Sequence, residues 1–98
     1  MILNLYALKN RLSGIFERPF AEIYDEKEYP ELLAQSLALA NPVELNRHKE
    51  FDLYKVGVID SKSGEITDAH VEFVCSLEQM CLTYLANKEG NDNVRKEA

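Results

Sequence analysis

The sequence predicts a small α+β domain (β-β-α-β-β-α): two β-hairpins forming a small antiparallel sheet, one helix between them, and a short C-terminal helix. The main observation is a turn signal, Asx-x-x-Ser-Gly, that occurs at residues 10–14 and again at residues 60–64. In such a signal the Asn or Asp side chain hydrogen-bonds the backbone two residues on, and Gly accepts the positive φ that closes the turn. Each copy follows an apolar run containing Leu-Tyr, and a segment with helical spacing of apolar residues separates them.

The first hairpin is predicted from residues 2–9 and residues 15–20. Both faces of the first strand are largely apolar, which is typical of a central strand or of a strand at a subunit contact. Pro19 cannot donate to a ladder of backbone hydrogen bonds. The second strand therefore ends at Pro19 or lies at the edge of the sheet.

The helix between the hairpins begins after Asp25, which is a suitable N-cap, with Glu28 three residues on as in a capping box. The dipeptide Asn41-Pro42 is expected to end it, because a residue before proline avoids the α region. One face carries residues at helical spacing: Tyr29, Leu32, Leu33, Ser36, Leu37 and Ala40.

The second hairpin is predicted from residues 51–59 and residues 66–75. Gly57 marks a close backbone approach or a bulge in the first of these strands. In the second strand, Val71, Phe73 and Cys75 are expected on one face, toward the core. A further capping box at residues 76–79 then starts a helix over residues 77–88. Residues 1–88 are thus expected to form a single domain, and residues 89–98 a flexible polar tail.

Composition narrows the class of protein. The chain has 98 residues, a formal net charge of −6, and no run of apolar residues long enough to span a membrane. The apolar start of the chain has no basic region and no cleavage site of small residues, so the sequence predicts a cytoplasmic protein without a signal peptide. The acidic balance argues against a protein that coats nucleic acid through many phosphate contacts.

No arrangement of residues points to catalysis or to a metal. Four residues could be ligands or nucleophile partners, but their spacing matches no familiar zinc pattern: His48, His70, Cys75 and Cys81. A thiol in a predicted core stripe is inert, and the four glycines do not form a phosphate loop. The sequence therefore predicts a protein that is not an enzyme, with two reduced cysteines, no cofactor and no metal site.

Aromatic and basic residues do gather on the predicted strands. The first 20 residues carry three basic side chains and one acidic one. Aromatic rings on a sheet surface stack on unpaired bases while neighbouring cations contact phosphates. The alternative is that the rings are core residues and the charges are simply solvated. The candidate nucleic-acid site comprises Tyr6, Lys9, Arg11, Phe16, Arg18, Tyr54 and Lys55.

Three stretches, in this order, resemble the small nonstructural protein of gokushovirus-type microviruses, which are phages with circular single-stranded DNA genomes. They are Leu-Tyr-Ala-Leu-Lys-Asn-Arg-Leu-Ser-Gly-Ile-Phe followed by Pro-Phe (residues 5–20), Phe-Asp-Leu-Tyr-Lys-Val-Gly (51–57) and Asp-Ser-Lys-Ser-Gly-Glu-Ile (60–66). The likeness covers about residues 3–77, and the tail beyond is longer than is usual for the family.

The resemblance implies a non-virion protein in the host cytoplasm that serves the single-stranded DNA stage of genome replication. Single-stranded DNA and viral or host replication proteins are the partners it implies, and it carries over no catalytic residue. The residues leave a second hypothesis open, in which the chain is a homo-oligomeric protein-interaction module that acts on a viral or host protein without touching DNA. The two apolar faces of residues 2–8 and 51–59 favour that alternative.

Overall fold

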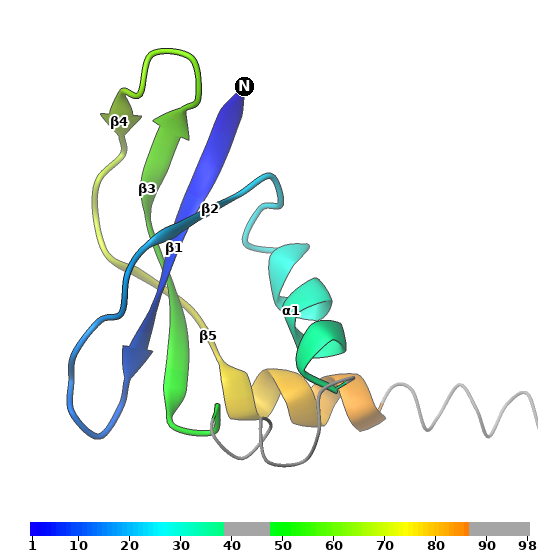
Figure 1. Cartoon of the computed structure of the whole chain (residues 1–98). Coiled ribbons are helices and arrows are strands. Elements are labelled where there is room, and N and C mark those ends of the chain that lie inside the picture. The colour runs from blue at the N-terminus through cyan, green and yellow to red at the C-terminus, as the bar shows by residue number, and fades with distance from the viewer. Residues whose placement is uncertain (39–47, 87–98) are drawn as a thin grey trace, which may run out of the picture.

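The computed structural model describes residues 1–38 and 48–86, and it confirms the α+β class. The strands are β1 (Ile2–Asn10), β2 (Phe20–Glu22), β3 (Phe51–Asp60), β4 (Ile66–Thr67) and β5 (Glu72–Ser76) (Figure 1). Helix α1 spans Tyr29–Ala38, and the described residues 77–86 are helical as well. The expected end of the first helix at Asn41-Pro42, and the tail over residues 89–98, lie outside the described residues.

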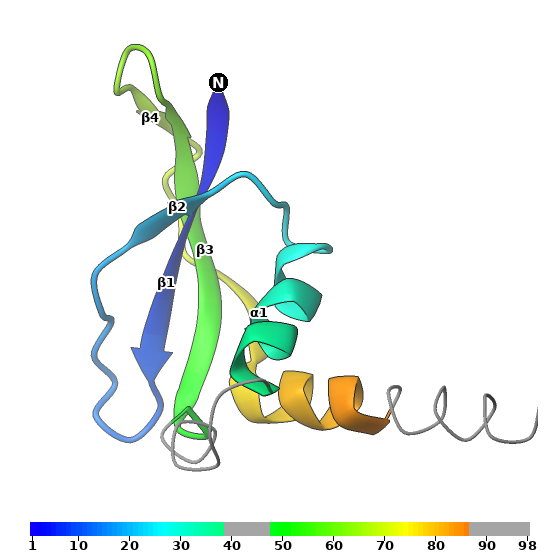
Figure 2. The ribbon, with the colours of Figure 1, turned by 45° about the vertical axis from the view of Figure 1, so that its right-hand side comes forward.

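All strand pairs are antiparallel, and the order across the sheet is β2-β1-β3-β4, with β5 also paired to β3. The central pair of β1 and β3 runs from Ile2 opposite Asp60 to Asn10 opposite Phe51. Both helices lie on the same side of the sheet (Figure 1, Figure 2). The core fills the space between the sheet and these helices, and its fully buried large side chains are Tyr6, Leu53 and Leu77.

The two predicted reversals form in the same way. In the first turn, Asn10 Oδ1 accepts a hydrogen bond from the N–H of Leu12 at 2.9 Å, and Gly14 N–H donates to Asn10 O at 2.8 Å. In the second, Asp60 Oδ1 accepts from the N–H two residues on at 2.9 Å, and Gly64 N–H donates to Asp60 O at 2.7 Å. Gly14 and Gly64 have φ values of 72° and 76°, so both glycines are in the region that disfavours other residues.

The return strand of the first hairpin lies later in the chain than predicted. After the turn, Phe16 makes an isolated bridge to Lys9, and strand pairing resumes only at Phe20, opposite Tyr6. Pro19, which has no N–H to donate, lies in the gap between them. The predicted strand over residues 15–20 is therefore wrong in its bounds, while the edge position that was one of its two alternatives is correct.

The cap of α1 is confirmed, although the regular helix starts later than its cap. Asp25 Oδ1 accepts from the N–H groups of Lys27 and Glu28 at 2.9 and 2.8 Å, and these hydrogen bonds lower the pKa of Asp25. Ala34, which the predicted stripe did not include, is fully buried and belongs to the core cluster. Two members of the predicted stripe, Leu32 and Ser36, are exposed instead. The predicted stripe is therefore right for Tyr29 and Leu37, which are buried, and wrong for Leu32 and Ser36. Ala40 lies outside the described residues.

The predicted strand over residues 66–75 is two strands, because the chain bends at Asp68, which has a φ of 50°. The β3–β5 register also shifts: Leu53 lies opposite Cys75 and Tyr54 opposite Phe73, which leaves Val74 without a partner. The extra residue puts Phe73 and Cys75 on opposite faces. The expected core stripe is therefore wrong for Phe73, which is 57% exposed, and for Val71, which is 61% exposed, whereas Cys75 packs against the core as predicted.

Ser76 caps the second helix as predicted, because its Oγ accepts a hydrogen bond from the N–H of Gln79 at 3.1 Å. The reciprocal bond of a capping box does not form, since the Gln79 side chain donates to Thr83 Oγ1 at 3.4 Å. The helix over residues 77–86 then buries Leu77, Met80 and Cys81 against the core. Within residues 1–38 and 48–86, no helix is long and apolar enough to cross a membrane.

Gly57 combines both of the features that were proposed for it. The β1–β3 register shifts beside it, since Leu5 pairs with Gly57 and Tyr6 with Lys55. β4 and the chain just beyond it also approach Gly57 closely, because a Cβ on Gly57 would lie 3.3 Å from Thr67 O and 3.7 Å from Ala69 Cα.

We expect Gly57→Val to lower the free energy of unfolding by about 1–3 kcal/mol, since its methyl groups would displace the backbone over β3. Gly57→Ala should be milder, because alanine also reduces the entropy of the unfolded chain by about 0.4–1 kcal/mol. Urea unfolding followed by circular dichroism measures both. A valine variant as stable as the wild type would mean that the backbone of β4 does not lie this close to Gly57.

Candidate nucleic-acid interface

The face of the sheet opposite the helices carries a row of three aromatic side chains, Phe16, Tyr54 and Phe73, which we call the aromatic row. The ring centroids of Phe16 and Tyr54 are 5.2 Å apart, and those of Tyr54 and Phe73 are 5.6 Å apart. Both contacts are edge-to-face, with interplanar angles of 72° and 76°. This is a favourable arrangement for aromatic pairs.

The register of the strands explains why these rings meet. Leu53 is buried in the core, so Tyr54 points to the opposite face of β3. Phe73 is the Cα partner of Tyr54 on β5 and therefore shares its face. Phe16 comes alongside because its bridge to Lys9 places it next to the strand that pairs with β3.

Lys9 supplies a cation to the aromatic row. Its Nζ lies 5.4 Å from the ring centroid of Phe16 and 5.8 Å from that of Tyr54, which are distances typical of cation–π contacts. Phe73 is 57% and Phe16 is 38% exposed, so the row is open to solvent. A positive charge beside exposed rings suits a ligand that is both aromatic and anionic, such as an unpaired nucleotide.

Tyr6 belongs to the core and not to this surface, so its predicted role in binding is wrong. Its side chain is fully buried and stacks on Tyr29 with centroids 4.9 Å apart. Its hydroxyl donates to Tyr24 O at 2.8 Å, and burial raises the pKa of Tyr6. Tyr6 precedes Ala7, which is the Cα partner of Tyr54. Alternation along the strand therefore sends Tyr6 to the helix side.

Two of the predicted basic residues, Lys55 and Arg11, form ion pairs with acidic side chains. Lys55 is the Cα partner of Tyr6 and so lies on the helix side, where its Nζ pairs with Glu26 Oε2 at 3.2 Å. Arg11 pairs with Asp52 Oδ1 at 2.8 Å, and this hydrogen bond raises the pKa of Arg11. Lys55 is thus excluded from the face of the aromatic row, and the charge of Arg11 is partly neutralised.

Arg18 is exposed, and within residues 1–38 and 48–86 its side chain makes no ion pair. The structure therefore brings together Lys9, Phe16 and Tyr54 from the predicted site. It adds Phe73, which sequence reasoning placed in the core. The only signal for Phe73 was its aromatic character, because the register shift that turns it outward depends on the pairing with β3.

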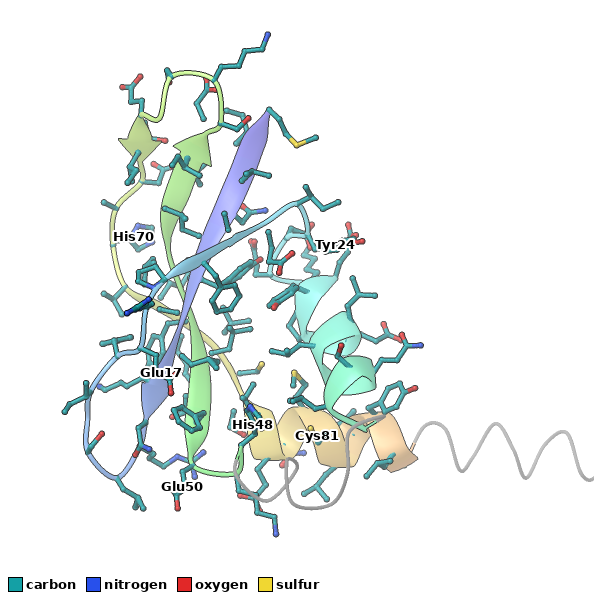
Figure 3. The ribbon with its side chains drawn as sticks, viewed as in Figure 1. Glu17, Tyr24, His48, Glu50, His70 and Cys81 are labelled. Atoms are coloured by element: carbon teal, nitrogen blue, oxygen red, sulfur yellow. The ribbon has the colours of Figure 1, made fainter. Side chains whose placement is uncertain are left out.

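The residues considered for catalysis or metal binding do not form a cluster. Figure 3 shows His70 near β4 and His48 at the other end of the sheet, near the helix over residues 77–86. Among the residues that the structure describes, no group of three His, Cys, Asp or Glu could hold a metal ion. Both cysteines are free, and burial raises the pKa of Cys75 to about 11, so its thiol is protonated at neutral pH.

Comparison with known proteins identifies no relative. No protein-family model, no curated protein and no solved structure matches this chain.

Proposed function

We propose that this chain is a non-catalytic accessory protein that binds single-stranded DNA on the open face of its sheet. The observation that carries the proposal is the aromatic row with Lys9 above it, exposed on the face that the helices leave uncovered. The resemblance to the nonstructural protein of gokushovirus-type microviruses supports the same function. It would place the protein in the host cytoplasm at the single-stranded stage of genome replication.

The site favours unpaired bases for a physical reason. The rings project from a sheet surface, where they can stack only on bases that are not already stacked within a duplex. Stacking is tolerant of sequence, since every base has a π-face. The net charge of −6 opposes long-range attraction of DNA. We therefore expect the protein to bind a few nucleotides weakly at the aromatic row, and not to coat single-stranded DNA along its length.

The test is a fluorescence anisotropy titration with labelled oligo-dT in about 20 mM salt. We expect binding with a Kd below about 100 μM, and weaker binding of a duplex of the same length. Lys9→Gln should weaken the complex and reduce the salt slope by about one. Lys62→Gln, in the second turn, is the matched control and should leave binding unchanged. No binding of oligo-dT at low salt would exclude the proposal.

A second function, that of a homo-oligomeric protein-interaction module that acts on a viral or host protein without touching DNA, is favoured by a different observation. Large apolar side chains are exposed at the sheet margins, among them Ile23 (58%) and Val71 (61%). Exposed apolar surface of this kind is typical of protein–protein contacts.

A further inference from the structure

Arg11 is held in place through both its backbone and its side chain. Its N–H donates to Glu50 O at 2.7 Å, and its Nη2 donates to Asp52 Oδ1 at 2.8 Å. The side chain of Asp52 is only 14% exposed, whereas that of Arg11 is 48% exposed. A nearly buried carboxylate therefore positions a guanidinium that is half open to solvent. A ligand that binds this guanidinium has little side-chain entropy to remove.

The guanidinium lies on the same face of the sheet as the aromatic row. Leu53 is buried in the core, so its neighbours Asp52 and Tyr54 both point to the open face of β3. The Cα partner of Asp52 is Lys9, whose Nζ lies over two rings of the row. Two residues along a strand span about 7 Å. The guanidinium of Arg11 is thus beside the row, within reach of a base that stacks on Tyr54.

The charges around Arg11 favour a neutral ligand atom over a phosphate. Asp52 and, more weakly, Glu78 raise the pKa of Arg11. These two carboxylates offset the charge of the guanidinium and would repel a phosphate. The edge of a base carries no net charge, so it escapes that repulsion. The bond to Asp52 uses one N–H of Nη2, and the other N–H groups of the guanidinium can still donate to a ligand.

We propose that Arg11 selects guanine in the bound strand by donating hydrogen bonds to O6 and N7, with Asp52 as a positioning residue. Guanine presents these two acceptors side by side, which matches the planar fork of arginine, whereas adenine presents a donor beside N7. Unpaired cytosine also has two adjacent acceptors, O2 and N3, but its smaller ring stacks less on the aromatic row. This inference rests on the proposed function and adds the base that the site prefers.

The test is an anisotropy titration with strands of oligo-dT, about eight nucleotides long, that carry one central substitution. The substituted base is guanine, adenine, cytosine or 7-deazaguanine, which keeps the ring and O6 of guanine but lacks the N7 acceptor. We expect the guanine strand to bind at least about fivefold more tightly than the adenine strand. The other two strands should resemble adenine. A guanine strand that binds no better than adenine or cytosine would overturn the proposal.

Arg11→Lys keeps the positive charge and removes the planar fork. It should abolish the preference for guanine and leave the affinity for plain oligo-dT within about twofold of the wild type. Arg18→Lys is the matched control, since Arg18 is exposed and makes no ion pair in the part of the chain that the structure describes. It should keep the preference. An Arg11→Lys variant that still prefers guanine, or an equal loss in both variants, would contradict the proposal.

Arg11→Gln distinguishes a base contact from a phosphate contact. A contact with guanine predicts an unchanged salt dependence for plain oligo-dT. A salt slope that falls by about one would mean that Arg11 binds a phosphate, and would overturn the proposal.

Asp52→Ala tests the positioning role. The variant frees the guanidinium and removes a negative charge from the open face. We therefore expect it to bind plain oligo-dT more tightly while its preference for guanine falls. If the affinities for all strands fell by the same factor, Asp52 would serve only the fold, and its positioning role would be rejected.

The same titrations separate this inference from the proposed function. Binding of oligo-dT without a preference for guanine would reject the role of Arg11 and leave the proposed function standing. A protein that binds none of the strands would reject the proposed function itself.

Discussion

Tyr6→Ala should lower the free energy of unfolding by about 3–5 kcal/mol, the range for removing a large aromatic side chain from a core. Tyr6 is fully buried, lies against both Tyr29 and Phe20, and donates a hydrogen bond to Tyr24 O. The loss is a large share of the ~5–15 kcal/mol that stabilises a domain of this size. We expect the variant to be partly unfolded at room temperature, as measured by urea unfolding.

Tyr6→Phe is the matched variant, because it keeps the ring and removes only the donor to Tyr24 O. It should cost about 0.5–1.5 kcal/mol, the net value of one hydrogen bond. It should also leave the affinity for oligo-dT unchanged, since Tyr6 does not reach the open face. A Tyr6→Phe variant that binds oligo-dT more weakly than the wild type, at equal folded fraction, would show that Tyr6 takes part in the binding surface.

Removing the two outer rings of the aromatic row should weaken oligo-dT binding at least about tenfold. A ring that stacks on a base contributes ~1–3 kcal/mol, and tenfold corresponds to about 1.4 kcal/mol. The double variant Phe16→Ala, Phe73→Ala keeps Tyr54 and Lys9. Both replaced side chains are more than a third exposed, so the core is left intact. Anisotropy titration at fixed low salt measures the loss.

The control is the double variant Leu12→Ala, Ile15→Ala, which removes two apolar side chains that are 77% and 67% exposed on the first turn. These side chains lie outside the aromatic row, so we expect affinity equal to that of the wild type. An equal loss in both double variants would indicate general apolar contact with DNA, and would contradict stacking on the aromatic row.

Features decided within a few residues could be predicted from the sequence. The two turns and both helix caps depend on one side chain and the backbone beside it, and each formed as expected. For the same reason the order of strands and helices along the chain was predictable. Pro19 limited the first hairpin, although pairing resumed after it and did not stop there.

Features decided by pairing between distant segments could not be predicted. Both faces of residues 2–9 are apolar, so only the position of α1 determines that Tyr6 is in the core. The exposure of Phe73 depends on the register shift at Val74, which no local pattern marks. The ion pair between Lys55 and Glu26 joins β3 to the segment before α1, and the sequence does not indicate how these two parts lie relative to each other. For these reasons the structure brings together only three of the seven predicted site residues, Lys9, Phe16 and Tyr54.

The aromatic row extends across the pairing between β1 and β3. Phe16 belongs to the first hairpin and Tyr54 to the second. Each hairpin forms by closing a short loop. The pairing of β1 with β3 joins positions about fifty residues apart, so its loop-closure entropy cost is higher. The two halves of the row thus become neighbours only when the long-range ladder is complete. A state in which both hairpins are formed but β1 and β3 are not paired would lack the complete aromatic row. If oligonucleotide binds the row as proposed, it would stabilise the pairing of β1 with β3.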